Sequence, residues 1–222
     1  MSDLPKIPWE GAQKERSLTH KRAGMVVDLR RCTGCHACSI SCKTEHDVSL
    51  GDFRTRVRYL EKPDRPQLSF LPLLCTHCQD APCLDVCPTE AIIRLEDGSV
   101  SINKDKCCGS KACITACPYN AIFIDEATGV ADKCDLCTHR TSLGMDPACV
   151  SSCPTDALIY GDLDNPEDPV AIIASKLKAK PLKEKSGTKP SVLYVGHEDW
   201  MEKESATGIQ LSPEDDEIIY EQ

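Results

Sequence analysis

The apolar residues of this chain fall into short runs, each bounded by turn-forming or charged residues. The runs in AIIRLEDGSVSIN and AIFIDEATGVADKC flank Asp97-Gly98 and Gly129, which predicts two β-hairpins. The runs GMVVD at 24–28 and ALI at 157–159 predict short buried strands. None of these runs approaches the roughly 18 apolar residues that a membrane-spanning helix needs, so no span is expected.

Two longer segments follow towards the C-terminal end of the sequence. LDNPEDPVAIIASKLKAK combines an acidic, proline-containing start with apolar residues at helical spacing, which predicts a capped amphipathic helix near 167–179. After residue 196 the sequence becomes acidic and poor in apolar residues, and we predict a surface extension there. The alternative is an arm that docks on a partner through its few large apolar side chains, which are Trp200, Ile218, Ile219 and Tyr220.

The cysteine content changes what is expected of the core. The 222 residues include 16 cysteines but only 5% aromatic residues, so few large side chains are available for a core. Metal ligation is therefore expected to supply part of the folding free energy. The cysteines form four groups, here called quartets 1 to 4: Cys32, Cys35, Cys38 and Cys42; Cys75, Cys78, Cys83 and Cys87; Cys107, Cys108, Cys113 and Cys117; Cys134, Cys137, Cys149 and Cys153.

Every quartet ends in Cys-x3-Cys, and three of the four end in Cys-Pro. The residues that follow repeat as PTEAII, PYNAIF and PTDALI, which indicates that one small unit has been duplicated. Spacing of i, i+4 places the last two cysteines on one face of a short helix. Proline then ends that helix, because the residue before a proline disfavours helical geometry.

The spacing favours iron–sulfur clusters over zinc or disulfides. Structural zinc usually takes two well-separated Cys-x2-Cys pairs, which the four cysteines within 32–42 do not resemble. Three close thiolates followed by Cys-Pro are typical of bacterial ferredoxins, where the fourth cysteine ligates the neighbouring cluster. The first residues contain no apolar segment of a secretory signal peptide, so a disulfide scaffold is not expected. A formal charge of −9 argues against a nucleic-acid partner.

If the fourth cysteine crosses over, the quartets must pair, and spacing alone does not say how. The two hairpins join quartet 2 to quartet 3, which favours one lobe over 70–129 and a second lobe made of 24–60 with 130–160. We therefore predict an α+β fold of duplicated ferredoxin-like lobes over 24–160. An N-terminal extension over 1–23 precedes it, and a helix, a strand and an acidic tail over 161–222 follow.

The chain resembles a known family, the four-cluster iron–sulfur subunits of the DMSO reductase (molybdopterin oxidoreductase) superfamily. The resemblance covers roughly residues 24–195 and rests on GMVVDLRRCTGCHACSISCKTEHDV, CTHCQDAPCLDVCPTEAI, CITACPYNAIF and KCDLCTHRTSLGMDPACVSSCP. It implies a subunit with no catalytic site of its own. Such a subunit relays electrons between a large subunit with a molybdenum or tungsten bis-pterin cofactor and a membrane quinone-reactive subunit or other redox partner. The alternative is a polyferredoxin-like module of a hydrogenase or formate-lyase type complex, or a free carrier.

The resemblance also implies which cysteines share a cluster. Cluster 1 takes Cys32, Cys35, Cys38 and Cys153, and cluster 2 takes Cys134, Cys137, Cys149 and Cys42. Cluster 3 takes Cys75, Cys78, Cys83 and Cys117, and cluster 4 takes Cys107, Cys113 and Cys87. The implied cofactors are three 4Fe-4S clusters and a fourth cluster that is 3Fe-4S or 4Fe-4S.

Quartet 3 departs from the family pattern, because Ser110 stands where the second cysteine is expected and Cys108 stands two residues too early. Three interpretations are open. Ser110 leaves one corner of a 3Fe-4S cluster without a ligand, Cys108 supplies the fourth ligand of a 4Fe-4S cluster, or the Ser110 oxygen ligates iron itself.

Four polar residues lie beside the quartets. We predict that His36 and His77 hydrogen-bond sulfur or backbone rather than ligate iron. Lys133 and Arg140 flank quartet 4, where their charges either offset cluster charge or are solvated. The expected location is a membrane-associated complex, and the side of the membrane is open.

Overall fold

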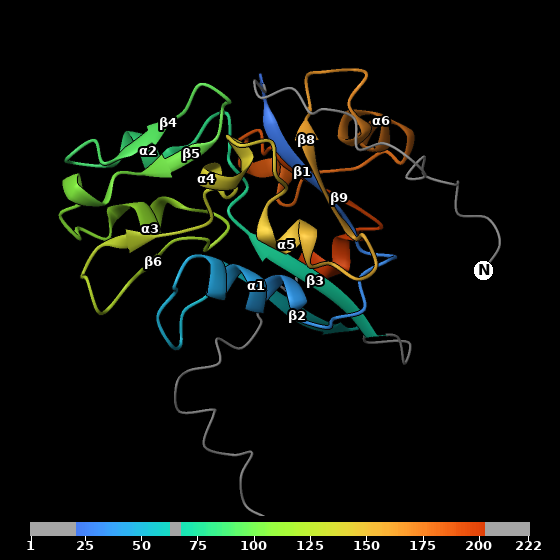
Figure 1. Ribbon diagram of the computed structural model, residues 1–222, viewed down its shortest axis with the longest axis horizontal. Helices are drawn as coiled ribbons and strands as arrows, with labels where there is room; N and C mark the ends of the chain where they lie inside the picture. The colour runs from blue at the N-terminus through green and yellow to red at the C-terminus, as the bar shows by residue number, and fades with distance from the viewer. Residues whose placement is uncertain (1–20, 63–67, 203–222) are drawn as a thin grey trace, which may run out of the picture.

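The computed structural model describes residues 21–62 and 68–202 (Figure 1). Most of the predicted N-terminal extension, and the residues Ile218, Ile219 and Tyr220, lie outside the described residues. The described chain has two parts. A three-stranded sheet with its helices makes one, and two small hairpins with two short helices make the other.

The three-stranded sheet has the order β8-β1-β9. β1 (Ala23–Asp28) pairs antiparallel with β8 (Leu158–Asp162) and parallel with β9 (Val192–Val195). Met25 and Val27 enter one core cluster and Val26 enters another on the opposite face, so the run GMVVD is apolar throughout because both faces of its strand are buried. The strands predicted at 24–28 and 157–159 are confirmed.

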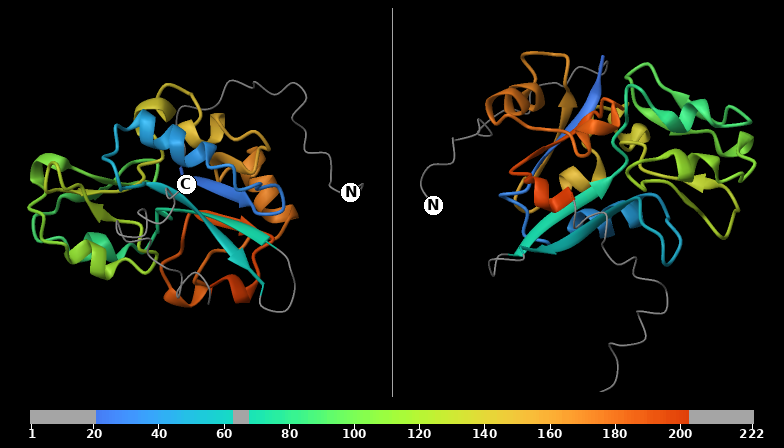
Figure 2. Two further views of the ribbon diagram at one scale, coloured as in Figure 1. Left: turned by 90° about the horizontal axis from the view of Figure 1, so that it is seen from below. Right: turned by 180° about the vertical axis from the view of Figure 1, so that it is seen from behind.

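The helix predicted near 167–179 is confirmed as α6 (Pro169–Lys176). Asp168 caps it, because its Oδ1 accepts a hydrogen bond of 2.9 Å from the backbone N–H of Val170. Val170 and Ile173 are buried against Val26 and cover the outer face of the sheet (Figure 2).

The second part is called here the hairpin lobe, residues 78–131. β4 (Ile92–Arg94) pairs with β5 (Val100–Ile102), and β6 (Phe123–Ile124) pairs with β7 (Ala131–Asp132), both antiparallel. Gly98 and Gly129 lie in the turns with φ of 78° and 71°, so both predicted hairpins are confirmed. With α2 (Pro82–Asp85) and α3 (Ala112–Ala116) the hairpins enclose a separate apolar core.

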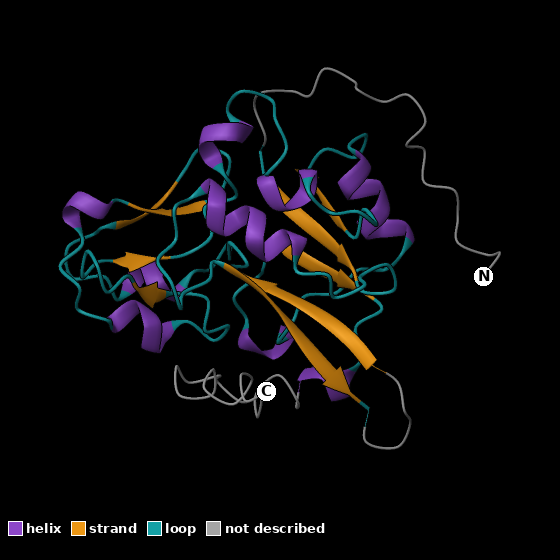
Figure 3. Cartoon of the chain, turned by 60° about the horizontal axis from the view of Figure 1, so that its bottom comes forward, coloured by secondary structure: helices purple, strands orange, loops and turns teal. Residues whose placement is uncertain are grey.

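A long hairpin of β2 (Thr55–Glu61) and β3 (Leu68–Leu74) was not predicted. It runs beside the main sheet, and its buried Leu71 and Leu74 pack in the same core as Met25 and Val27 (Figure 3). The alternation of polar and apolar residues in RTRVRYLE carried the signal for a strand.

The surface extension predicted after residue 196 does not begin there. Met201 is only 4% exposed, and Trp200 packs against the same core as Met25. The chain therefore remains folded through residue 202, and Trp200 is part of the core surface rather than of a free arm.

The remaining helices are α1 (Ala37–Glu45), α4 (Thr138–Thr141) and α5 (Ala148–Ser151). Two 3-10 turns lie at Lys104–Lys106 and Glu184–Ser186. Within the two described ranges, no helix combines the length and apolarity needed to cross a membrane.

Candidate iron–sulfur sites

The cysteines are carried by short helices and the loops before them. All 16 lie in the described part of the chain and are free thiols. The helices that carry quartets 2, 3 and 4 end at or before the Cys-Pro step, whereas α1, which has Lys43 in place of proline, continues to Glu45. The first cysteine of each Cys-x3-Cys pair lies in a helix: Cys38 in α1, Cys83 in α2, Cys113 in α3 and Cys149 in α5.

The repeated turn after each Cys-Pro has one conformation in all three copies. The third residue after the cysteine has a positive φ of 51°, 50° or 48°, at Glu90, Asn120 and Asp156. This turn aims the N–H of the next residue, an alanine, back at the cysteine sulfur. The distances are 3.3 Å from Ala91 N to Cys87 Sγ and 3.2 Å from Ala157 N to Cys153 Sγ, and Ala121 makes the same bond to Cys117. The alanine repeat therefore supplies N–H donors that stabilise thiolate charge.

Two groups of cysteines line cavities in the hairpin lobe or at its border. Site 3 is a hollow of about 330 Å³, part of it open to solvent, and its lining includes Cys75, Cys78, Cys83 and Cys117. Site 4 is a hollow of about 310 Å³, also partly open to solvent, and its lining includes Cys87, Cys107, Cys108, Ser110 and Cys113. Each site thus combines cysteines from two different quartets, as crossing over requires.

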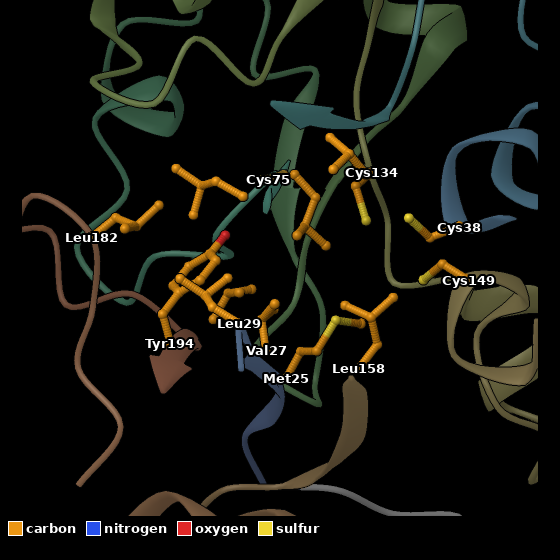
Figure 4. Close-up of a cluster of buried hydrophobic side chains, with 14 of the residues drawn as sticks. Met25, Val27, Leu29, Cys38, Cys75, Cys134, Cys149, Leu158, Leu182 and Tyr194 are labelled. Carbon is orange, nitrogen blue, oxygen red and sulfur yellow. The ribbon is translucent and has the colours of Figure 1, made fainter. Parts of the chain in front are cut away.

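The other two groups lie between α1, α5 and the loop of quartet 4. Burial is the main cause that raises the pKa of Cys38 to about 11, and the neighbouring Cys32 and Cys153 contribute to this rise. Cys35 in turn lies near Cys32, and we call these four cysteines candidate site 1. Burial also raises the pKa of Cys149 well above its usual value, with Cys137 and Cys42 adding to it. Figure 4 shows the sulfur atoms of Cys134 and Cys149, and Cys38 of the neighbouring site 1 lies beside Cys149. Site 2 is made of Cys42, Cys134, Cys137 and Cys149.

The donor chemistry of these sites fits iron–sulfur clusters. Burial raises the pKa of Cys83 to about 12 and that of Cys134 well above its usual value, so neither thiol ionises near neutral pH by itself. Bound iron would deprotonate such thiols outright, and thiolates are the ligands that iron–sulfur clusters require.

The loops of quartets 1 and 3 have the same backbone. Gly34 and Gly109 have φ of 70° and 67°, the residues before the helices, His36 and Lys111, have φ of 59° and 63°, and α1 and α3 begin directly after them. In this alignment Ser110 takes the position of Cys35, and both residues are exposed. Cys108 takes the position of Thr33 instead, one residue before the glycine.

A buried ion-pair network beside site 2 was not predicted. Arg54, at the start of the β2–β3 hairpin, contacts Asp132 at 2.8 Å (Nη2 to Oδ1) and Asp135 at 3.2 Å (Nη1 to Oδ2). His46 lies next to it, with Nε2 at 3.1 Å from Cys137 Sγ. Neither residue belongs to a cysteine motif, so no local pattern indicated them.

The four polar residues that lie beside the quartets in the sequence make different contacts in the structure. His77 accepts a backbone hydrogen bond of 3.0 Å from Val100, as predicted. His36 bonds the Tyr59 hydroxyl at 3.0 Å, rather than sulfur or backbone. Arg140 pairs with Glu45 at 3.0 Å, whereas Lys133 is 2% exposed and therefore not solvated.

Four sulfur-lined sites on helical turns and small hairpins define a ferredoxin-like iron–sulfur protein. Comparison with known proteins agrees, because the family described as a 4Fe-4S dicluster domain matches residues 66–163.

Relatives extend the match along the chain. A tetrathionate reductase subunit from Salmonella typhimurium is 40% identical over 200 residues, which cover 87% of this chain and 80% of the relative. A polysulfide reductase chain from Wolinella succinogenes is 40% identical over 182 residues, covering 79% of this protein and 94% of the relative. The arsenate respiratory reductase iron–sulfur subunit of Shewanella sp. strain ANA-3 is 32% identical over 224 residues, with coverage of 78% and 96%. The chain belongs to this family, the iron–sulfur electron-transfer subunits of the DMSO reductase superfamily.

Proposed function

We propose that the chain relays electrons through four iron–sulfur clusters and performs no catalysis of its own. The observation that carries the proposal is the row of four adjoining sites. Cys149 of site 2 neighbours Cys38 of site 1, and Cys134 of site 2 neighbours Cys75 of site 3. Sites 3 and 4 meet at the packed helices α2 and α3. When bound, such clusters accept and donate single electrons without transfer of an atom.

Exposure distinguishes the ends of this row from its middle. Cys35 of site 1 and Ser110 at the corner of site 4 are exposed, whereas Cys134 and Cys149 of site 2 are buried. In site 3, three cysteines are buried as well: Cys75, Cys78 and Cys83. We infer that electrons enter and leave at sites 1 and 4, and that protein shields sites 2 and 3 from solvent. The two ends would belong to two duplicated lobes, one with sites 1 and 2 and one with sites 3 and 4.

The partners are proposed from the relatives. Their names describe components of tetrathionate, polysulfide and arsenate reductases, so a large molybdopterin catalytic subunit is the expected partner at one end. A membrane quinone-reactive subunit, or another redox protein, is proposed at the other end, which would place the complex at a membrane.

Anaerobic purification of the full chain with its partners tests this function. We expect about 15 iron atoms per chain, which is three four-iron clusters and one three-iron cluster, and reversible reduction by dithionite. A large partner containing molybdenum or tungsten is expected to copurify. Iron for two clusters or fewer, or a nickel-containing partner, would contradict the proposal.

For site 4 we propose a 3Fe-4S cluster held by Cys87, Cys107 and Cys113, with Ser110 at the open corner. The shared backbone of the loops at 32–38 and 107–113 supports this, because it gives Ser110 the position of Cys35. Cys108 lies one residue before the glycine, at the position of Thr33, where the loop of quartet 1 has no cysteine.

Replacing the serine at this corner should complete the ligand set. Ser110→Cys is expected to raise the iron content by one atom per chain and to remove a three-iron EPR signal of the oxidised protein. Cys108→Ala is the matched control and should leave that signal unchanged. A wild-type protein without the three-iron signal, together with loss of iron in Cys108→Ala, would instead assign Cys108 as the fourth ligand.

A further inference from the structure

Thr76 places a buried hydroxyl beside a sulfur of site 3. The residue follows Cys75, the first cysteine of quartet 2, and belongs to the lining of the hollow at this site. Its Oγ1 lies 3.1 Å from Cys78 Sγ, and the residue is only 2% exposed. Bulk solvent therefore does not reach this hydroxyl, and the fold provides the sulfur as its hydrogen-bond partner.

The state of the cysteine decides which of the two atoms donates. A free thiol and a hydroxyl can each donate a proton to the other. A cysteine that ligates iron is a thiolate and carries no proton, so in the loaded protein only the Thr76 hydroxyl can donate. A buried donor without an acceptor is unfavourable, which holds the hydroxyl on the sulfur of Cys78.

The backbone around Thr76 is held from two sides. The Thr76 carbonyl accepts a hydrogen bond of 2.8 Å from the N–H of Ser191, a buried residue directly before β9. The ring of the next residue, His77, accepts a hydrogen bond of 3.0 Å from the N–H of Val100 in β5. Two segments that are distant in sequence therefore order the loop in which the hydroxyl and the sulfur meet.

The other three quartets carry a different group at this position, directly after the first cysteine. In quartet 1 it is Thr33, which is exposed, so solvent can satisfy its hydroxyl. In quartet 3 it is the exposed Cys108. In quartet 4 it is Asp135, whose carboxylate accepts a hydrogen bond of 2.8 Å from the N–H of Cys137. Of the four positions, the one in quartet 2 therefore offers a buried hydroxyl to a cluster ligand.

A second hydroxyl near Cys78, that of Thr188, has oxygen partners as well. Its Oγ1 lies 2.7 Å from the Tyr119 hydroxyl and 3.1 Å from Ser186 Oγ, and either oxygen can accept its proton. Within residues 21–62 and 68–202, the Thr76 hydroxyl has the sulfur as its one hydrogen-bond partner. Thr76 is therefore the residue whose donor is committed to Cys78.

We propose that Thr76 is a positioning residue that raises the reduction potential of the site 3 cluster by donating a hydrogen bond to Cys78 Sγ. The proposal rests on the electron-relay function proposed above. When site 3 is reduced, one electron arrives from a neighbouring cluster, which is thereby oxidised, and the hydroxyl proton stays on its oxygen. The added negative charge is shared by the ligand sulfurs, and a hydrogen bond to sulfur strengthens with that charge. The bond therefore stabilises the reduced state more than the oxidised one.

Redox titration of the purified, cluster-loaded full chain, followed by EPR, tests this. Thr76→Val replaces the hydroxyl by a methyl group of similar size and removes the donor. We expect one midpoint potential to fall by at least about 28 mV, which is about a threefold change in the one-electron equilibrium constant at about 59 mV per tenfold change. This midpoint should belong to the signal that Cys78→Ser alters. The site 4 signal, identified by its response to Ser110→Cys, should stay in place.

Two further variants separate the hydrogen bond from packing. Thr76→Ser keeps the hydroxyl and should keep the wild-type midpoint. Thr33→Val is the matched control, because it makes the same change at the same loop position in an exposed residue, and it should leave all midpoints unchanged.

Unchanged midpoints in fully loaded Thr76→Val would overturn the proposal. An equal fall in Thr76→Ser would assign the shift to packing and would overturn it too. Thr76→Ala removes the hydroxyl without adding a methyl group beside the sulfur, and it should reproduce the fall even if Thr76→Val does not load. Failure of both to load, where Thr76→Ser loads, would assign the hydroxyl to cluster assembly instead. Absence of clusters from the wild type would contradict the proposed function itself, and this proposal with it.

Discussion

Removal of iron with a chelator is expected to unfold this protein rather than leave a folded apoprotein. Seven cysteines belong to the apolar cores themselves: Cys38, Cys75, Cys134 and Cys149 in one, and Cys78, Cys83 and Cys113 in the other. Ligation of a cluster by these cysteines contributes folding free energy, because the ligands come together only in the folded chain. A domain has only about 5–15 kcal/mol of stability in total, so the loss of this contribution is expected to unfold it.

The stability of the iron-free fold is expected to fall as the pH rises. In the iron-free fold, burial raises the pKa of Cys38 to about 11 and of Cys83 to about 12, whereas unfolded cysteine ionises near about 8.5. Their contribution to stability is therefore present below about pH 8.5 and is lost as pH rises toward the folded values. In the loaded protein the thiolates are bound, and acid weakens the protein because protons compete with iron.

Far-UV circular dichroism and protease resistance, measured anaerobically before and after chelation, check the prediction. Loss of both signals is expected, with recovery when iron and sulfide are returned. Residual structure after chelation should weaken as the pH is raised from 7 to 10. A chain that retains its spectrum and its protease resistance after complete loss of iron would show that the cores are stable without the clusters.

The local elements could be predicted from the sequence because each has a local cause. Gly98 and Gly129 form their turns through positive φ, Asp168 caps α6, and a proline follows the end of the helix in quartets 2, 3 and 4. The residues repeated after Cys-Pro predicted a duplicated unit. The structure explains why alanine recurs there, because its N–H donates a hydrogen bond to the cysteine sulfur.

The long-range partners could not be predicted in this way. Arg54 meets Asp132 across 78 positions of sequence, and nothing in RTRVRYLE distinguishes it from its neighbouring arginines. The burial of Lys133 likewise depends on Val100, which lies 33 positions away. The sequence places Lys133 beside quartet 4, and the fold brings its Nζ to the Val100 carbonyl of the hairpin lobe as well.

Arg54→Met is expected to destabilise the loaded protein by about 3–5 kcal/mol, the usual cost of removing one partner from a buried ion pair. The Arg54 side chain is 6% exposed, and its guanidinium grips both oxygens of Asp132, at 2.8 and 3.1 Å. It also holds Asp135, in the loop between Cys134 and Cys137. Asp132 ends β7, at the border of the hairpin lobe, so the variant leaves one buried and one partly buried carboxylate without this cation and loosens the junction between the parts.

Anaerobic guanidinium unfolding of the loaded chain measures this loss, and two comparisons make it specific. Arg54→Met with Asp132→Asn should cost less than the sum of the single changes, because the stranded charge is removed with its partner. Burial opposes ionisation of Asp135, but Arg54 and His46 hold its pKa below its usual value. This contribution is present above about pH 4 and is lost as pH falls through the folded pKa, so the gap between wild type and Arg54→Met should stay constant from pH 7 to about pH 4 and narrow below about pH 4. A loss below about 1 kcal/mol, or a gap independent of pH, would contradict a structural role for the network.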